Sequence, residues 1–110
     1  MSAAKEVLES LKGGQALRYN KGKLKWSLVD FKSMEPMVQA LEFGAKKYSP
    51  NNWKKGMQTE EIFDSLLRHI FALMDGEEKD KESGLSHVGH IQCNAMFLAY
   101  NLIKKNKNGN

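Results

Sequence analysis

Apolar residues recur every three or four positions along most of the chain, which is the spacing of an α-helix with one buried face. Four segments carry this pattern: residues 3–11, 33–48, 59–74 and 86–105. Ser33 and Pro36 are typical of a helix start, and Gly76 is typical of a helix end. The sequence therefore predicts an all-α fold, a compact helical bundle of about four helices.

The stretch before the second predicted helix breaks this pattern. Residues 17–31 alternate loosely and contain Gly22, so we expect an extended basic N-terminal arm or a short hairpin there. From Arg18 to Lys55 the chain has nine basic residues and three acidic ones. The whole chain, residues 1–110, is expected to be a single domain. Its parts are an N-terminal helix and linker (1–17), a core (18–105) and a frayed tail (106–110).

Composition narrows the class of protein. Of the 110 residues, 41% are apolar, which suffices for one hydrophobic core and excludes intrinsic disorder for most of the chain. The absence of a long apolar run and of a signal-peptide core predicts a protein that neither enters a membrane nor is secreted. Cys93 is the one cysteine, so it can form no internal disulfide, and we expect it in the core. The net charge of +4 suits solubility or an acidic ligand.

A narrow polar stripe follows the fourth predicted helix. His87, His90, Asn94 and Asn101 fall on one side of a helical wheel, with apolar residues on both flanks. A helix that is apolar nearly all round is buried, so this stripe is expected to face the interior. Buried imidazoles and amides need partners, which are either neighbouring helices or a ligand.

An acidic segment immediately precedes this helix. Five carboxylates lie between Asp75 and Glu82, where they repel one another unless solvent or a cation separates them. Flexible carboxylates that supply several oxygens are the ligands that Mg²⁺ or Mn²⁺ requires, whereas a solvated connector between helices is the simpler interpretation. His69 either points at the same site or caps the core. Trp26 and Trp53, both next to lysines, either stack on a nucleobase or belong to the core.

Several short motifs occur in order along the chain. The front half contains GKLKWSL at 22–28, FGAKKY at 43–48 and NWKKG at 52–56; the second half contains LRH at 67–69 and GEEKDKESGLSHVGH at 76–90, followed by Asn94. This set resembles the phage dATP/dGTP diphosphohydrolase family, which is related to the MazG-like all-α nucleotide pyrophosphohydrolases. The chain has Lys25 and Ser27 where that family commonly has an arginine and an acid. It has His87 and His90 where MazG-like proteins carry an acidic pair.

The resemblance implies metal-dependent hydrolysis of dATP or dGTP to the monophosphate and pyrophosphate, in phage nucleotide metabolism in the cytoplasm of the infected host cell. Mg²⁺ or Mn²⁺ would be the cofactor, and its implied ligands are Glu77, Asp80, Glu82, His87 and His90. The implied catalytic residues are Glu77, Asp80, His87 and His90. The implied nucleotide-binding residues are Lys23, Lys25, Lys46, Lys47, Asn52, Trp53, Arg68 and His69. A homodimer or tetramer is expected, because a partner subunit would help to enclose the polar stripe.

Two other classes of function remain open on the sequence. One is a non-catalytic protein that binds or sequesters a nucleotide or a nucleotide signal, which the histidines in place of acids would fit. The other is a nucleic-acid-binding or structural phage protein that uses the basic arm and tail. The latter leaves the acidic and histidine residues without a role, and its basic residues are spread over different elements.

Overall fold

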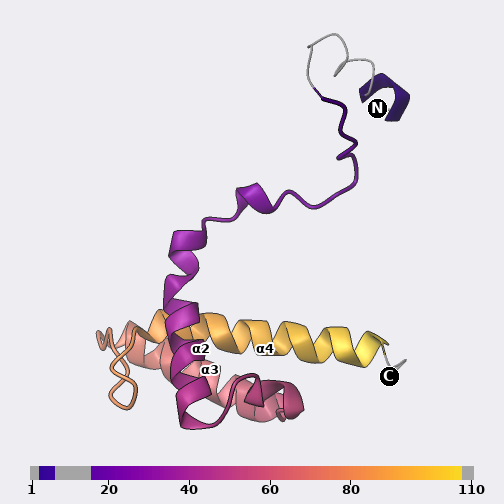
Figure 1. Cartoon of the computed structure of the whole chain (residues 1–110). Coiled ribbons are helices and arrows are strands. Elements are labelled where there is room, and N and C mark those ends of the chain that lie inside the picture. The colour runs from indigo at the N-terminus through magenta and orange to yellow at the C-terminus, as the bar shows by residue number, and fades with distance from the viewer. Residues whose placement is uncertain (1–2, 7–15, 108–110) are drawn as a thin grey trace.

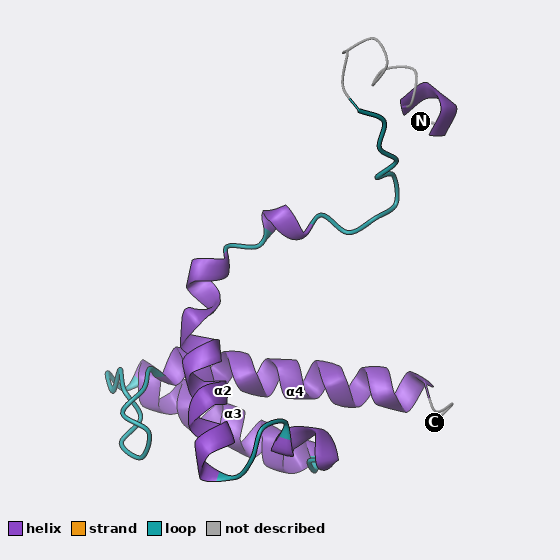
Figure 2. Cartoon of the chain, in the orientation of Figure 1, coloured by secondary structure: helices purple, strands orange, loops and turns teal. Residues whose placement is uncertain are grey.

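The computed structural model describes residues 3–6 and 16–107, and the regular elements of this part of the chain are helical. The long helices are α2 (Glu35–Lys47), α3 (Thr59–Met74) and α4 (His87–Lys107). Figure 2 shows helices and loops but no strand among the described residues. The predicted all-α fold is therefore confirmed. Within the same residues, no helix combines the length and the apolarity that are needed to cross a bilayer.

α4 is the central helix, because α2 and α3 both pack against it (Figure 1). The approach of α2 is closest at Gly89, where an added Cβ would lie 2.2 Å from the backbone oxygen of Pro36. One turn further along α4, the Cys93 thiol donates a hydrogen bond to the backbone oxygen of Met37 at 3.3 Å. The two helices are therefore in close contact at a position that only glycine can occupy without displacing its neighbour.

The helix boundaries agree closely with those predicted from the sequence. α3 has the predicted bounds, and α2 follows a 3₁₀ turn at Phe31–Met34 that occupies the predicted helix start. α4 reaches Lys107, so residues 106 and 107 are helical rather than frayed. Of the first predicted helix, residues 3–6 are helical and the remainder lies outside the described residues. Residues 108–110 also lie outside them.

Residues 16–30, which we call the arm, lead away from the three-helix body (Figure 1). Their one regular element is a 3₁₀ turn at Trp26–Leu28. Leu24, Trp26 and Leu28 are 80%, 67% and 82% exposed. Of the two predicted conformations, the extended arm is therefore present and the hairpin is not.

The apolar residues of α2 lie largely along a cavity. The sequence pattern places Met34, Met37, Val38, Leu41, Ala45 and Tyr48 on one face of the helix, and the last four of these residues line the cavity. The buried residue of α2 is Ala40, roughly a quarter-turn away around the helix, and it lines the cavity too.

The apolar surface of α3 is wider than the part that the body covers. Ile62 is fully buried, as the sequence predicted. Four apolar side chains of this helix remain exposed, and we call them the α3 stripe: Phe63, Leu67, Phe71 and Met74. The sequence pattern places these four residues on the same apolar face as Ile62, and the body covers only part of that face. The buried apolar side chains of the described residues are few, namely Ala40, Ile62 and Cys93.

Candidate functional site

A cavity of about 950 Å³ lies between α2, α3, α4 and two connecting segments. The segments are the 3₁₀ turn η3 (Asn52–Lys55) and the acidic loop, residues 75–86. The cavity contains many of the residues that the sequence singled out: Lys47, Asn52, Trp53, Arg68, His69, Glu77, Asp80, Glu82, His87 and His90. Its volume is in the range of pockets that hold small molecules.

Three of the implied binding residues lie elsewhere. Lys23 and Lys25 belong to the arm, and Lys46 does not line the cavity although its neighbour Lys47 does. The structure therefore brings together the second half of the predicted site with Lys47, Asn52 and Trp53 of the front half, and it leaves the basic motif at residues 22–28 apart from them.

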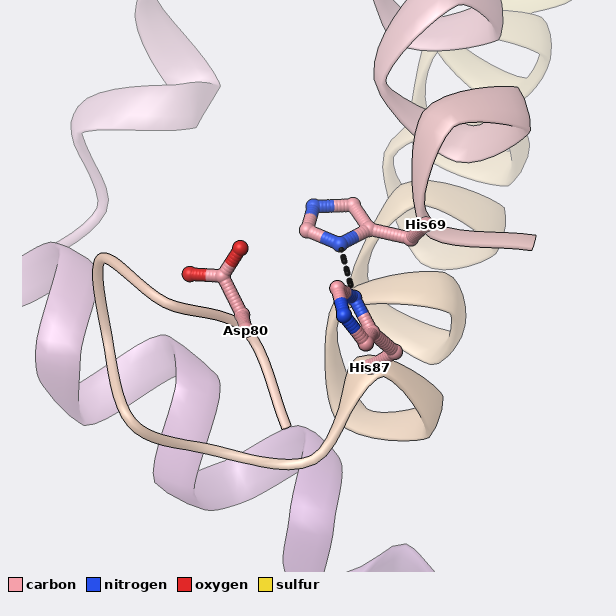
Figure 3. A group of neighbouring side chains, drawn as sticks. All are labelled: His69, Asp80 and His87. Carbon is pink, nitrogen blue, oxygen red and sulfur yellow. Dashed lines mark hydrogen bonds between the residues drawn. The ribbon is translucent and has the colours of Figure 1, made fainter. Parts of the chain in front are cut away.

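Three histidines meet inside the cavity. His69 Nδ1 and His87 Nδ1 are joined by a hydrogen bond of 2.8 Å, in which one ring donates and the other accepts (Figure 3). The rings of His69 and His90 are stacked, with centroids 4.6 Å apart and planes 8° from parallel. α3 supplies His69 and α4 supplies the other two, so the contact between these helices creates the cluster.

The acidic loop is folded against the start of α4 by its own backbone. The amide of Asp80 donates to the oxygen of Leu85, and the amide of Gly84 donates to the oxygen of Asp80, both at 2.8 Å. Lys79 and Ser86 form an antiparallel bridge across the loop. These bonds fix the position of Asp80 in the loop, and one of its carboxylate oxygens lies within 4.8 Å of ring nitrogens of His69 and His87 (Figure 3).

Ser83 connects the loop to the histidines. Its amide donates to Asp80 Oδ2 at 2.8 Å, and its hydroxyl lies 2.7 Å from His90 Nε2. Burial by itself would raise the pKa of Asp80, but the two hydrogen bonds from Ser83 lower it below its ordinary value. The carboxylate of Asp80 is therefore ionised near neutral pH.

Burial lowers the pKa of both His69 and His90. For His69 the effect of burial is reinforced by the neighbouring His90, whereas for His90 it is opposed by Asp80. Both rings are consequently neutral near pH 7, and each has a nitrogen lone pair that can accept a proton or a metal ion.

His87 is the most enclosed member of the cluster, with 3% of its surface exposed. One of its nitrogens bonds to His69, whereas the other, Nε2, is buried without a hydrogen-bond partner. The nearest carboxylate oxygen that faces it is Glu77 Oε1 at 3.8 Å, which is beyond hydrogen-bond distance. A buried ring nitrogen without a partner is costly, so this atom marks a place for a ligand.

Further along α4 the cavity becomes aromatic. The Trp53 ring packs against Phe97 at 5.1 Å and against the edge of Tyr100 at 4.9 Å between centroids. Asn101 donates from Nδ2 to the backbone oxygen of Met57 at 3.1 Å, which ties the segment after η3 to α4. Trp53 therefore forms part of the cavity wall, in contact with α4, rather than part of a separate core.

Charged side chains lie at the rim of the cavity. Lys47 forms an ion pair with Glu82, and this contact raises the pKa of Lys47. The Lys54 ammonium lies 5.3 Å from the centre of the Trp53 ring. Because Glu82 is paired with a lysine and exposed, it is less available to a metal ion than Asp80, whose carboxylate lies near the histidines.

The sequence analysis missed some members of the site. Of the polar stripe on α4, His87 and Asn94 are buried and His90 lines the cavity, whereas Asn101 lies outside it. Asn94 donates to Ser65 Oγ of α3 at 3.2 Å. Ser65 and Ser83 were not predicted, although a serine three residues after an aspartate is a familiar turn pattern. His69 had been assigned either to the site or to the core, and the structure has it in the cluster.

An all-α chain with histidines and a carboxylate in one large cavity has the features of a ligand-binding or catalytic domain. Residues 13–110 match the family model described as "dATP/dGTP diphosphohydrolase, N-terminal", and the chain belongs to this family. It is also similar to the dATP/dGTP diphosphohydrolase of Salmonella phage PMBT28, with 32% identity over 82 residues. That match covers 74% of this chain and 28% of the phage protein. No solved structure matches the chain significantly.

Proposed function

We propose that this chain hydrolyses a purine deoxynucleoside triphosphate, dATP or dGTP, to the monophosphate and pyrophosphate. The family description and the phage relative both name dATP and dGTP, which supports the substrate class. The chain spans 28% of the length of that relative. The activity of the longer protein is therefore a proposal for this chain, and the experiment below tests the chain by itself.

The shape of the cavity is the observation that carries the proposal. His87 and Phe97 both line it, and they are ten residues apart on α4. At about 1.5 Å per residue this separation is about 15 Å, which suits an extended nucleotide. The polyphosphate would lie at the histidine end, and the base would lie at the aromatic end against Trp53.

The side chains of the cavity fit these two tasks. Lys47, Lys81 and Arg68 line the cavity and would hold phosphate oxygens, with the arginine able to bind two oxygens at once. His90 is neutral near pH 7, so its ring can accept the proton of an attacking water. Ser83 holds His90 in position for this role.

The sequence predicted a divalent cation, Mg²⁺ or Mn²⁺, and the donor set of this cavity fits a divalent cation that accepts both carboxylate and imidazole ligands. Asp80 supplies an ionised carboxylate, and the unpartnered Nε2 of His87 supplies a lone pair or a proton beside Glu77. Once bound there, such an ion would neutralise charge on the triphosphate.

A second copy of the chain is proposed to cover the α3 stripe. The stripe is apolar and exposed, and none of its four residues lines the cavity. In a dimer with a twofold axis, the same surface of each copy lies in the interface. Because the α3 stripe carries no charge, the two copies of the stripe can pack together without like-charge repulsion. The assembly would be the homodimer or tetramer that the sequence predicted.

The test is a product analysis on the full chain. Each dNTP and NTP is incubated with Mg²⁺, with Mn²⁺ or with EDTA, and the products are separated by anion exchange. We expect monophosphate and pyrophosphate from dATP or dGTP, and a fall in kcat/KM of about 10²-fold or more in Asp80→Asn. Asp75→Asn, a change in the same loop at a residue that does not line the cavity, is the matched control.

Two outcomes would contradict the proposal. If the nucleotides stay intact at high protein concentration but bind, the chain is a nucleotide-binding protein without catalysis. If Asp75→Asn loses as much activity as Asp80→Asn, the activity does not depend on this site.

A further inference from the structure

We propose that His69, Asp80 and His87 hold a resident transition-metal ion of the class that binds imidazole, from Mn²⁺ to Zn²⁺, and that the site rejects Mg²⁺. The inference deepens the proposed function, because it concerns the same cavity. Its test contains no nucleotide, however, so the two can fail separately.

Three observations converge on this site. One ligand atom from each of the three residues lies within 4.8 Å of the others. The Nε2 atom of His87 is buried without a hydrogen-bond partner, which is an independent sign that something binds there. In Figure 3 the Asp80 side chain lies on one side and the paired rings of His69 and His87 lie on the other.

The chemistry of the donors selects the ion. Mg²⁺ requires an octahedral shell of oxygen atoms and keeps several waters, whereas two of the three ligands here are imidazoles. Two histidines and one carboxylate are a common set for zinc and for iron(II), with at least one position left open. The three residues line the cavity, so the open position would face the space where we propose the nucleotide to bind.

The surroundings supply the supporting contacts that metal-binding side chains need. Ser83 fixes the Asp80 carboxylate through its amide, and the ring of His90 stacks on His69. The Glu77 carboxylate lies 3.8 Å from His87 Nε2, where it can act as a further oxygen donor or as an acceptor for the ring. Such outer contacts hold the ligands in place before the metal arrives.

The experiment measures metal binding to the untagged full chain. Protein stripped with a chelator is titrated with Zn²⁺, Co²⁺, Mn²⁺ or Mg²⁺, and retained metal is counted by elemental analysis after desalting. We expect about one transition-metal ion per chain, visible d–d absorption with Co²⁺, and a Tm that rises by roughly 10 °C when free metal exceeds Kd a hundredfold. Excess Mg²⁺ should displace none of it.

Variants separate this site from other metal-binding surfaces. Asp80→Asn and His69→Gln should each weaken affinity by roughly tenfold or more, whereas Asp75→Asn should bind as the parent does. Asparagine retains an oxygen that can accept the Ser83 amide, and the Tm of the metal-free variants checks that they fold. The proposal is overturned if the stripped chain takes up no ion, if Mg²⁺ competes effectively, or if Asp75→Asn loses as much affinity as Asp80→Asn.

Discussion

The reactivity of the Cys93 thiol depends on its burial between α2 and α4. It is 5% exposed and its thiol donates to the Met37 carbonyl, and burial raises its pKa to about 11. A thiol reagent at pH 8 should therefore label the native chain slowly and the denatured chain quickly, because the thiolate is the reactive form. A thiol-release assay with and without denaturant measures both rates. Rapid labelling of the native chain would contradict the burial.

The same residue affects stability at high pH. The pKa of Cys93 is higher in the folded chain than its ordinary value of 9.0, so the folded state binds the thiol proton more tightly. Its contribution to stability is complete below pH 9 and is lost as the pH rises toward 11.

Residue by residue, the sequence predicted much of the candidate site. His87 and Asn94 were found because the helical period put them on one stripe, and that information is local. The partner of His87 is His69, 18 residues earlier on another helix, and their contact depends on how α3 meets α4. No local pattern carries that information, which explains why the role of His69 stayed open.

At the scale of elements, Gly89 decides how α2 meets α4. An alanine Cβ would lie 2.2 Å from the Pro36 oxygen, so Gly89→Ala should push the two helices apart and cost roughly 1–3 kcal/mol of unfolding free energy. Gly44→Ala is the matched control, because a Cβ at Gly44 of α2 meets nothing within 4 Å. Helix propensity favours this control change by up to about 1 kcal/mol.

Urea denaturation of both variants measures the difference. If Gly89→Ala were as stable as Gly44→Ala, the close contact between α2 and α4 would not exist in solution.

The helices themselves were predicted well, because starts, ends and periodicity are encoded within each segment. The packing of their apolar faces was predicted less well, because the sequence pattern of an apolar face does not indicate whether it packs in the core, lines a cavity or stays exposed. Val38, Leu41 and Tyr48 form such a face on α2, and they line the cavity rather than the core. An apolar wall for a ligand and an apolar face for the core have the same sequence pattern.

At the scale of the whole molecule, the exposed α3 stripe gives a test of assembly. A charge at its centre, as in Leu67→Glu, should dissociate a dimer, since a buried unpaired carboxylate is strongly unfavourable. Gln39→Glu, which adds the same charge at an exposed position of α2, should leave the assembly unchanged. Light scattering after size exclusion measures the molar mass of each variant. A parent chain that is monomeric at all concentrations would contradict the proposed homo-oligomer.

The arrangement of the whole molecule was the hardest part to predict. The basic motif at residues 22–28 and the acidic loop both looked like parts of one site, yet the arm leads away from the body that contains the loop (Figure 1). Opposite charges indicate which segments attract each other, but the path of the backbone determines which segments come into contact.

The bonds within the acidic loop have a consequence for ligand affinity. Asp80 is held through its amide, its carbonyl and its carboxylate by Leu85, Gly84 and Ser83. Ordering a free residue costs about 1–2 kcal/mol of backbone entropy, and here that cost is met when the chain folds. A ligand that binds Asp80 would therefore contact a carboxylate that is already held in place. Less of the binding free energy would then be lost to the entropy cost of ordering the loop.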